Sequence, residues 1–269
     1  MSSPDSTLPP ADHQAIYLYA VAREALDPVQ EPGVEDRPVH PFQHASFAAA
    51  VSIVERADWE GDAGAENLES LSWVAPRAYR HEEIVESVMA DSGPVYPARF
   101  GTLFSTSERL REALDTHREA LRSYFDTIAG AEEWAVKGLL DRERAKAHLV
   151  EEPASAESGT AYLQRRKQMQ EASAAVEEWL DQAADALFGP LAAHADESRV
   201  LPVQGNAGRE AEVAFNWAFL VPQTQAEPFQ SAVAQQDQAY AAEGLSLDLT
   251  GPWPPYNFRP SLGMGAQNE

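Results

Sequence analysis

Cysteine is absent from the 269-residue chain, and lysine occurs only three times. Without cysteine the chain cannot form a disulfide framework, use a thiol in catalysis or bind a metal through thiolates. Such a chain fits a cytoplasmic location, where structural disulfides are rare. The composition is otherwise that of a globular protein, with 44% hydrophobic and 23% charged residues.

Positive charge is scarce as well. The chain has 20 basic residues against 43 acidic ones, so its formal net charge is −23. We therefore expect neither nucleic acid nor an anionic membrane as a partner, because both repel such a chain. Two origins of the acidic, lysine-poor composition stay open: a high-salt cytoplasm that screens self-repulsion, or a GC-rich genome that favours arginine and alanine.

Long hydrophobic runs and common catalytic motifs are also missing. Residues 1–14 lack the features of a secretory signal, and no apolar run approaches the ~20 residues that span a bilayer. There is no G-x-x-x-x-G-K-[ST] loop, no dinucleotide fingerprint after a strand, no H-E-x-x-H and no G-x-S-x-G. His40 and His44 lie four residues apart in a proline-bounded loop with no helix to align them. We predict no catalytic residue, no cofactor and no metal site.

The first part of the chain predicts strands separated by loops. We expect a mobile tail over residues 1–13 and strands at Ile16–Val21 and Phe47–Val54. Residues 27–41 are rich in proline and residues 57–72 are acidic and contain glycine, so both stretches are predicted as loops.

A helix is predicted to begin near Pro76, since proline is favoured in the first helical turn. His81, Ile84 and Val88 then follow at helical spacing. A single histidine on the apolar edge of a helix is more often a hydrogen-bonded packing residue than a ligand, and we interpret His81 in this way.

Val95–Phe104 has the sequence V-Y-P-A-R-F-G-T-L-F, which predicts a strand that enters a glycine turn. Arg99 stands between apolar neighbours, and we expect it to form an ion pair or to stack on a ring rather than to bind a ligand. Ser105–Glu108 matches a capping box, and one amphipathic helix is predicted from there to Gly130. We call Val95–Phe104 the signature segment.

Glu133–Leu140 is predicted as a further strand. The order strand, strand, helix, strand, helix, strand favours a four-stranded sheet with two helices on one face. We therefore predict a ferredoxin-like domain over residues 14–141.

The remaining chain predicts a second small α/β domain over residues 142–258 and a tail over 259–269. The overall class is α+β, with two sandwich-type domains. The expected elements are a short helix at 142–149, a linker at 153–159, a helix from Tyr162 to Leu187, strands at 201–203, 213–222 and 245–249, and a helix at 229–240.

Arg165, Arg166 and Lys167 form a basic cluster in an acidic chain. Two interpretations stay open: ion pairs with neighbours such as Glu171, or a docking patch for an acidic partner. Because three adjacent residues span most of a helical turn, they cannot all face one partner.

The most conspicuous stretch is Gly251–Phe258, G-P-W-P-P-Y-N-F, which we call the C-terminal segment. Its prolines exclude a helix and a central strand, so we expect an extended conformation. Its three aromatic rings are large enough to cover an apolar surface. The segment either fixes its own domain or also presents a surface to a partner.

The two segments, together with E-W-A-V-K, Y-L-Q-R-R-K and N-W-A-F-L-V-P, resemble the conserved motifs of the GvpL/GvpF family of gas vesicle proteins. The resemblance covers nearly the whole chain. It implies a non-enzymatic accessory protein of the cytoplasm that associates with gas vesicles and binds their hydrophobic shell subunit and other accessory proteins. It also implies a modified ferredoxin-like C-terminal domain. It does not separate the F branch from the L branch.

The candidate partner-binding residues are the aromatic and basic side chains of the two segments: Arg99, Phe100, Phe104, Trp253, Tyr256 and Phe258. Two other functions stay open from the residues alone. One is an enzyme on a ferredoxin-like scaffold, since such folds host many chemistries. The other is a general protein-interaction adaptor.

Overall fold

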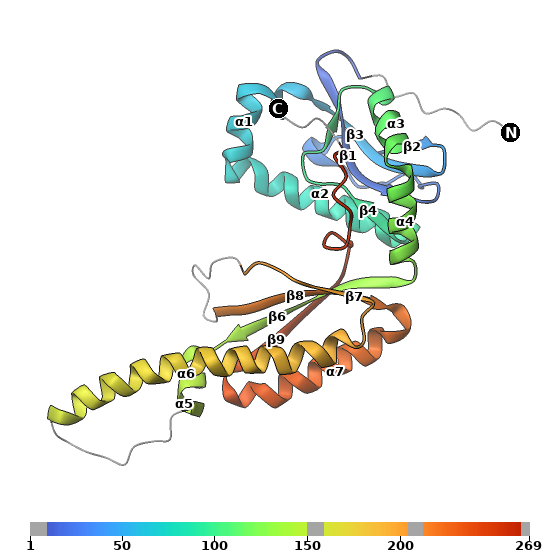
Figure 1. The fold of residues 1–269 in the computed structure, drawn as a ribbon. Coiled ribbons are helices and arrows are strands. Elements are labelled where there is room, and N and C mark those ends of the chain that lie inside the picture. Colours follow the sequence, from blue (N-terminus) through green and yellow to red (C-terminus); the bar gives the residue numbers. More distant parts are fainter. Residues whose placement is uncertain (1–9, 150–158, 204–211, 265–269) are drawn as a thin grey trace. The chain divides into compact units, whose positions relative to one another are not determined.

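The computed structural model of the protein describes residues 10–149, 159–203 and 212–264, with the backbone alone over 159–172. The chain divides into two compact units: Met1–Ala129 with Pro254–Glu269, and Gly130–Trp253 (Figure 1). Each unit is built on one antiparallel sheet with helices packed on it. The predicted α+β class is confirmed. None of the helices within the described ranges is long and apolar enough to cross a membrane.

The first unit holds a sheet in the order β2-β3-β1-β4, and β5 also pairs with β1. Its central strand β1 is buried along almost its whole length. The strands are β1 Gln14–Ala22, β2 His40–His44, β3 Phe47–Glu55, β4 Val95–Pro97 and β5 Leu103–Phe104; the helices are α1 Gly61–Glu69, α2 Leu71–Ser92, α3 Ser107–Thr116 and α4 Arg118–Ile128, with 3-10 turns at Val34–Asp36 and Arg56–Asp58.

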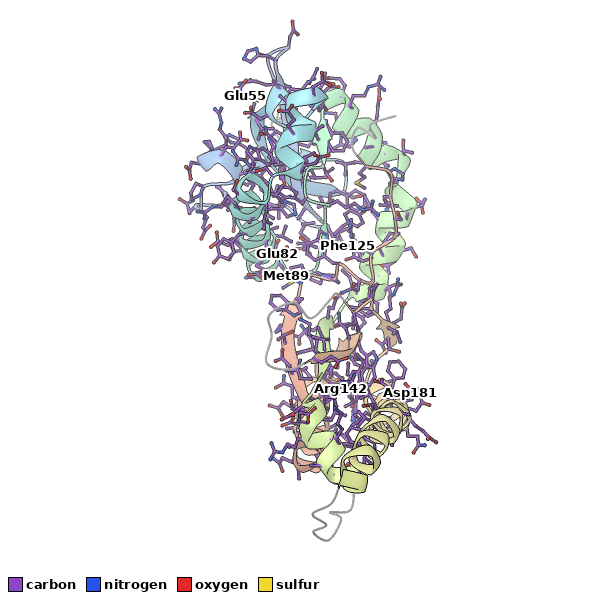
Figure 2. The ribbon with its side chains drawn as sticks, turned by 90° about the vertical axis from the view of Figure 1, so that its left-hand side faces the viewer. Glu55, Glu82, Met89, Phe125, Arg142 and Asp181 are labelled. Atoms are coloured by element: carbon purple, nitrogen blue, oxygen red, sulfur yellow. The ribbon has the colours of Figure 1, made fainter. Side chains whose placement is uncertain are left out.

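Helices cover both faces of this sheet, which explains why β1 is apolar at every position from Ala15 to Ala22 rather than at every second one. On one face, Tyr17 and Tyr19 of β1 share a core with Ile84 of α2. On the other, the ring of Phe47 stacks on Phe125 of α4, with centroids 6.0 Å apart. Figure 2 shows α2 and α4 on opposite sides of the strands. The predicted placement of both helices on one face is wrong, and the ferredoxin-like layout is not confirmed.

Several local predictions for this unit are also corrected. Residues 57–72 are largely helical, and Pro76 lies inside α2 instead of in its first turn. The predicted helix of residues 107–130 is interrupted at His117. Its N-cap is Thr106, whose hydroxyl accepts a hydrogen bond from the Arg109 N–H, so the cap lies one residue beyond the predicted Ser105.

The second unit has a sheet in the order β7-β8-β6-β9. Alternate residues of β6 and β8 enter one core with α6 and α7, as the strand period of two requires. The strands are β6 Ala131–Leu140, β7 Glu197–Val200, β8 Glu212–Pro222 and β9 Leu245–Trp253; the helices are α5 Arg142–Leu149, α6 Gly159–Ala192 and α7 Ala226–Tyr240, with 3-10 turns at Gln223–Gln225 and Ala241–Glu243.

The unit boundaries differ from the predicted domains 14–141 and 142–258. The strand β6, which we expect in the first domain, is central in the second sheet, where it pairs with both β8 and β9. The described part of the expected tail 259–269 belongs to the first unit, where the Tyr96 hydroxyl donates to the Pro260 carbonyl. The strand expected at 201–203 lies at Glu197–Val200 instead.

Some predictions fall outside the described residues. These are most of the tail 1–13, most of the linker 153–159, and the side chains of Arg165–Lys167. The C-terminal segment does contribute to a strand, because Gly251–Trp253 ends β9, but β9 lies at the edge of its sheet as the prolines demand.

Candidate functional site: the signature segment and the C-terminal segment

The signature segment is held on β1 at both of its ends. Its first residues form β4 and its last form β5, and both strands pair with β1. Between them, the Ala98 N–H donates to the Tyr19 carbonyl at 2.8 Å, and the Leu18 N–H donates to the Thr102 carbonyl at 2.9 Å. Gly101 has φ +78°, a conformation that favours glycine, so the turn is specified by the sequence.

A buried hydrogen-bond relay connects this turn to α2. The Gly101 N–H donates to the Tyr17 hydroxyl at 3.2 Å, and this hydroxyl lies 2.8 Å from Nδ1 of His81. Burial lowers the pKa of His81 to about 4, and the positive charge of Arg259 acts in the same direction. The ring of His81 is therefore neutral, and its Nδ1 shares one hydrogen bond with the Tyr17 hydroxyl. The prediction that His81 is a hydrogen-bonded packing residue is confirmed.

Burial also changes the acidity of the two tyrosines of β1. It raises the pKa of Tyr17 well above its ordinary value and that of Tyr19 to about 12. The Tyr19 hydroxyl donates to Ser52 Oγ at 3.0 Å and accepts from the Val34 N–H at 2.8 Å. Both tyrosines stay protonated across the physiological range and act as structural hydrogen-bond partners.

From Pro254 onwards the C-terminal segment lies on the first unit, where it meets the signature segment. The Tyr124 hydroxyl of α4 lies 3.0 Å from the Val95 carbonyl and 3.3 Å from the Pro255 carbonyl. The Arg259 guanidinium lies over the rings of Tyr96 and Tyr256, at 5.6 and 5.7 Å from their centroids. The signature segment and the C-terminal segment, which are far apart in the sequence, are therefore joined in one site.

The ring of Tyr256 fixes the segment to α2. Its hydroxyl donates to Glu82 Oε2 at 3.0 Å. Burial, with the nearby charge of Glu82, raises the pKa of Tyr256 far above its ordinary value. Burial also raises the pKa of Glu82, although the hydrogen bond from Tyr256 opposes that change. The pair is thus a donor-acceptor contact between a neutral phenol and a half-buried carboxyl group.

The six predicted partner-binding residues divide by exposure. Phe104 and Phe258 are buried, and Phe100 and Tyr256 are half-buried. Arg99 and Trp253 are exposed, with 38% of Trp253 accessible to solvent. Within the described residues Arg99 has neither the ion pair nor the ring contact that we expect for it. A role of these residues in binding a partner stays a prediction.

Sequence reasoning missed three contributors to the site: Tyr96, Tyr124 and Arg259. Tyr96 lies inside the signature segment, where its apolar neighbours give the same strand pattern. Arg259 falls in the stretch assigned to a tail. The position of Arg259 directly after an aromatic, proline-rich segment could have indicated docking rather than mobility for that residue, whereas no local pattern marks Tyr124.

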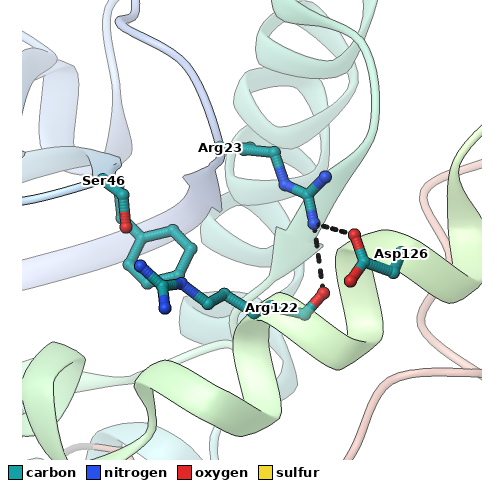
Figure 3. A pocket seen from close by; sticks show the side chains of 5 residues that line it. Arg23, Ser46, Arg122 and Asp126 are labelled. Carbon is teal, nitrogen blue, oxygen red and sulfur yellow. Dashed lines mark hydrogen bonds and ion pairs between the residues drawn. The ribbon is translucent and has the colours of Figure 1, made fainter.

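A small hollow opens elsewhere on the first unit, lined by Arg23, Ser46, Phe47, Arg122 and Asp126. Figure 3 shows that the Arg23 guanidinium is committed to the Asp126 carboxylate and to the Arg122 carbonyl. Its charge is thus already neutralised from within. Among the described residues no three histidine or acidic side chains lie together as metal ligands would.

Comparison with known proteins places the chain in a family. The sequence model of the family described as "Gas vesicle synthesis protein GvpL/GvpF" matches residues 15–260. The chain therefore belongs to the GvpL/GvpF family, and the resemblance of its motifs is confirmed. The family is one of gas vesicle accessory proteins.

Related sequences come from both bacteria and archaea. Gas vesicle protein L of a Streptomyces species is 26% identical over 255 residues, which are 90% of this chain and 91% of that protein. Gas vesicle protein L2 of Halobacterium salinarum is 30% identical over 208 residues, covering 70% and 72% of the two chains. Proteins of the F branch match as well, among them gas vesicle protein F1 of Halobacterium salinarum at 24% identity.

Two solved structures share the fold. The crystal structure of GvpF from Anabaena sp. PCC7120 superposes with a TM-score of 0.69 and 19% identity, covering 95% of this chain and all of that one. The structure of GvpF from Microcystis aeruginosa gives a TM-score of 0.64 at the same identity, covering 91% and 98%.

Proposed function

We propose that the protein acts in the cytoplasm during gas vesicle formation, where it binds the hydrophobic shell subunit and other accessory proteins and associates with the vesicle. The family match over residues 15–260 carries this proposal. The charge of the chain supports it, because a body of net charge −23 stays soluble while it holds an apolar, aggregation-prone partner. The exposed indole of Trp253 is an apolar anchor of the kind that dominates binding energies.

Co-expression with the shell subunit tests this proposal. We expect the shell subunit to remain in the soluble fraction and to co-purify with the protein. Absence of association at every salt concentration from about 0.1 to about 3 M, where exposed charges are screened to different degrees, would reject the proposed partner.

Trp253→Ala then tests the anchor. The ring is partly exposed and its Nε1–H donates to Thr250 Oγ1 at 3.1 Å. We therefore expect the free energy of unfolding to fall by about 1–2 kcal/mol, less than for a fully buried ring, while shell binding is lost. Val200→Ser is the matched control, since Val200 is an exposed apolar residue of the same unit. Equal binding by both variants would remove Trp253 from the interface.

A further inference from the structure

The first two turns of α2 present an uncharged face to solvent. Over residues 71–80 the exposed positions are Leu71, Ser72, Ala75, Pro76 and Tyr79. None of them carries a charge, although almost one residue in four of the whole chain does. Exposed helical positions of a soluble protein are normally charged or polar. This stretch therefore departs from the surface composition of the rest of the chain.

The apolar members of this face form a stripe along the helix. Leu71, Ala75 and Tyr79 are spaced four residues apart, so they lie above one another over roughly 12 Å. Leu71 is 79% exposed and Tyr79 is 68% exposed, and Leu68 at the end of α1 is 42% exposed. We call Leu71, Ala75, Pro76 and Tyr79 the apolar stripe. Side chains this exposed add little to the stability of the fold, so packing does not account for them.

Acidic residues lie at both ends of the apolar stripe. Helix α1 exposes Asp62, Glu66 and Glu69 and contains no basic residue. Beyond Tyr79, α2 continues with further carboxylates: Glu82, Glu83 and Glu86.

The two arginines beside the stripe are already engaged. The Arg77 guanidinium stacks on the Trp73 ring at 4.0 Å and lies 3.4 Å from Glu35 Oε1, and Arg80 pairs with Glu83 at 2.7 Å. With Arg77 and Arg80 paired to Glu35 and Glu83, and Glu82 bonded to Tyr256, the acidic residues Asp62, Glu66, Glu69 and Glu86 are left in excess, so the net charge around the stripe is negative.

We propose that the apolar stripe is a docking surface for an amphipathic helix of a partner protein, with lysine or arginine on the borders of its apolar face. Backbone groups within α2 are paired inside the helix, so the surface offers no edge to an incoming strand. A helical partner satisfies its own backbone and needs only apolar contact. The acidic residues at the two ends of the stripe then select basic flanks.

Charge argues against two other occupants. A second copy of the protein would bring the same acidic residues together across a two-fold axis, where they repel. An anionic membrane surface would be repelled in the same way. The inference goes beyond binding of the shell subunit, because it assigns a separate surface and the chemistry of its ligand. It does not depend on Trp253 or Arg99.

The test uses the full chain and a designed helical peptide of about 18 residues, with leucines on one face and lysines on both borders of that face. Isothermal titration calorimetry in physiological salt measures its affinity. We expect Leu71→Gln with Tyr79→Gln to weaken binding about tenfold or more, as loss of an interface anchor does. Both substitutions keep the charge and use a good helix former, and an unchanged melting temperature will show that the fold is intact.

Matched controls decide whether binding is specific. Val200→Gln with Val203→Gln removes two exposed apolar residues of the second unit and is expected to leave the affinity unchanged. Peptides with glutamate borders, or with serine in place of leucine, are expected not to bind. Equal losses in both double variants, or binding of the serine peptide, would overturn the proposal. A dimer in sedimentation analysis that Leu71→Gln with Tyr79→Gln dissociates would also overturn it, because the occupant would then be a second copy.

Discussion

The ring of His81 lies at the centre of the aromatic cluster around the signature segment. It is only 2% exposed, stacks on Tyr19 and meets Tyr17 and Phe100 edge-on. Burial outweighs the opposing effect of the Ala98 backbone, so the pKa of His81 is lowered from 6.5 to about 4. A buried ring with this pKa is neutral in the folded protein under physiological conditions, and it ties α2 to the turn of the signature segment through Tyr17.

The lowered pKa of His81 predicts that the protein loses stability in mild acid. Below pH 6.5 the unfolded chain protonates His81 and the folded protein does not, until the pH reaches about 4. The free energy of unfolding should therefore lose about 3 kcal/mol over this window through His81 alone. Urea unfolding at pH 7 and near pH 4 measures the loss, and His81→Gln isolates it, because the variant is less stable at pH 7 but should depend less on pH. NMR titration of His81 near its ordinary value would contradict this account.

At the scale of elements, residues 255–260 connect α2, β4 and α4 through hydrogen bonds. Tyr256 contacts Glu82 of α2, Pro260 accepts from Tyr96 of β4, and Pro255 lies within reach of Tyr124 of α4. Each of the three contacts uses a tyrosine hydroxyl. The carbonyls of Pro255 and Pro260 can accept these hydrogen bonds because this stretch is not helical, so no helical N–H occupies them. The segment thus stabilises the first unit from the far end of the chain.

Tyr256→Phe tests this connection. The variant leaves the ring in place but removes the donor to a half-buried carboxyl group, so we expect the free energy of unfolding at pH 7 to fall by about 1–3 kcal/mol. The pKa of Glu82, already raised by burial, should rise further. The cost should shrink in acid, where Glu82 is protonated and the bond weakens. Tyr79→Phe is the control. Tyr79 lies on α2, the helix that also carries Glu82, and its ring is exposed, so the protein should tolerate the change. Equal stabilities of the two variants would show that the bond has no structural role.

The sequence predicts the elements with strong periodicity and misses those that depend on distant contacts. The strand at Phe47–Val54 is confirmed, and so is the exclusion of a central strand from the C-terminal segment, since β9 lies at the edge of its sheet. The stretch 57–72 was predicted as a loop from its acids and glycines, whereas α1 and the start of α2 form there around Gly64, which lies against the Trp59 backbone. Local composition does not contain that contact.

The candidate site shows the same division. The prolines and aromatic rings of the C-terminal segment single it out, and the signature segment is predicted as a strand that enters a glycine turn. The structure buries Phe258 and leaves Trp253 exposed. Tyr96, Tyr124 and Arg259 were missed because their roles arise only when residues 95 and 255 meet. No local pattern specifies a meeting across that separation.

At the scale of the whole molecule, the division into units follows strand pairing rather than chain order. The strand β6 reads as the fourth strand of a first domain, since it follows α4 directly. Alternate side chains of β6 are instead buried in the core of the second unit, and β6 pairs with β8 along almost its entire length. The chain then returns to the first unit after Trp253, so the first unit is completed only by the end of the sequence, whereas the second is one continuous stretch.

The net charge of −23 also acts on the whole molecule. Acidic residues repel one another over a Debye length of about 10 Å at 0.1 M salt, and higher salt shortens this range. We therefore expect the urea midpoint to rise between about 0.05 and about 1 M potassium chloride, with sodium chloride giving the same result because the effect is screening. Loss of structure at low salt would favour a high-salt host over a GC-rich genome as the origin of the composition. An unchanged or lower midpoint would show that repulsion is already balanced.

The most direct test of the central claim is made in cells. Deletion of the gene from its host should abolish gas vesicles, measured by electron microscopy and by pressure-sensitive turbidity, and expression of the intact chain should restore them. Normal vesicle numbers in the deletion strain would contradict a role of this protein in gas vesicle formation.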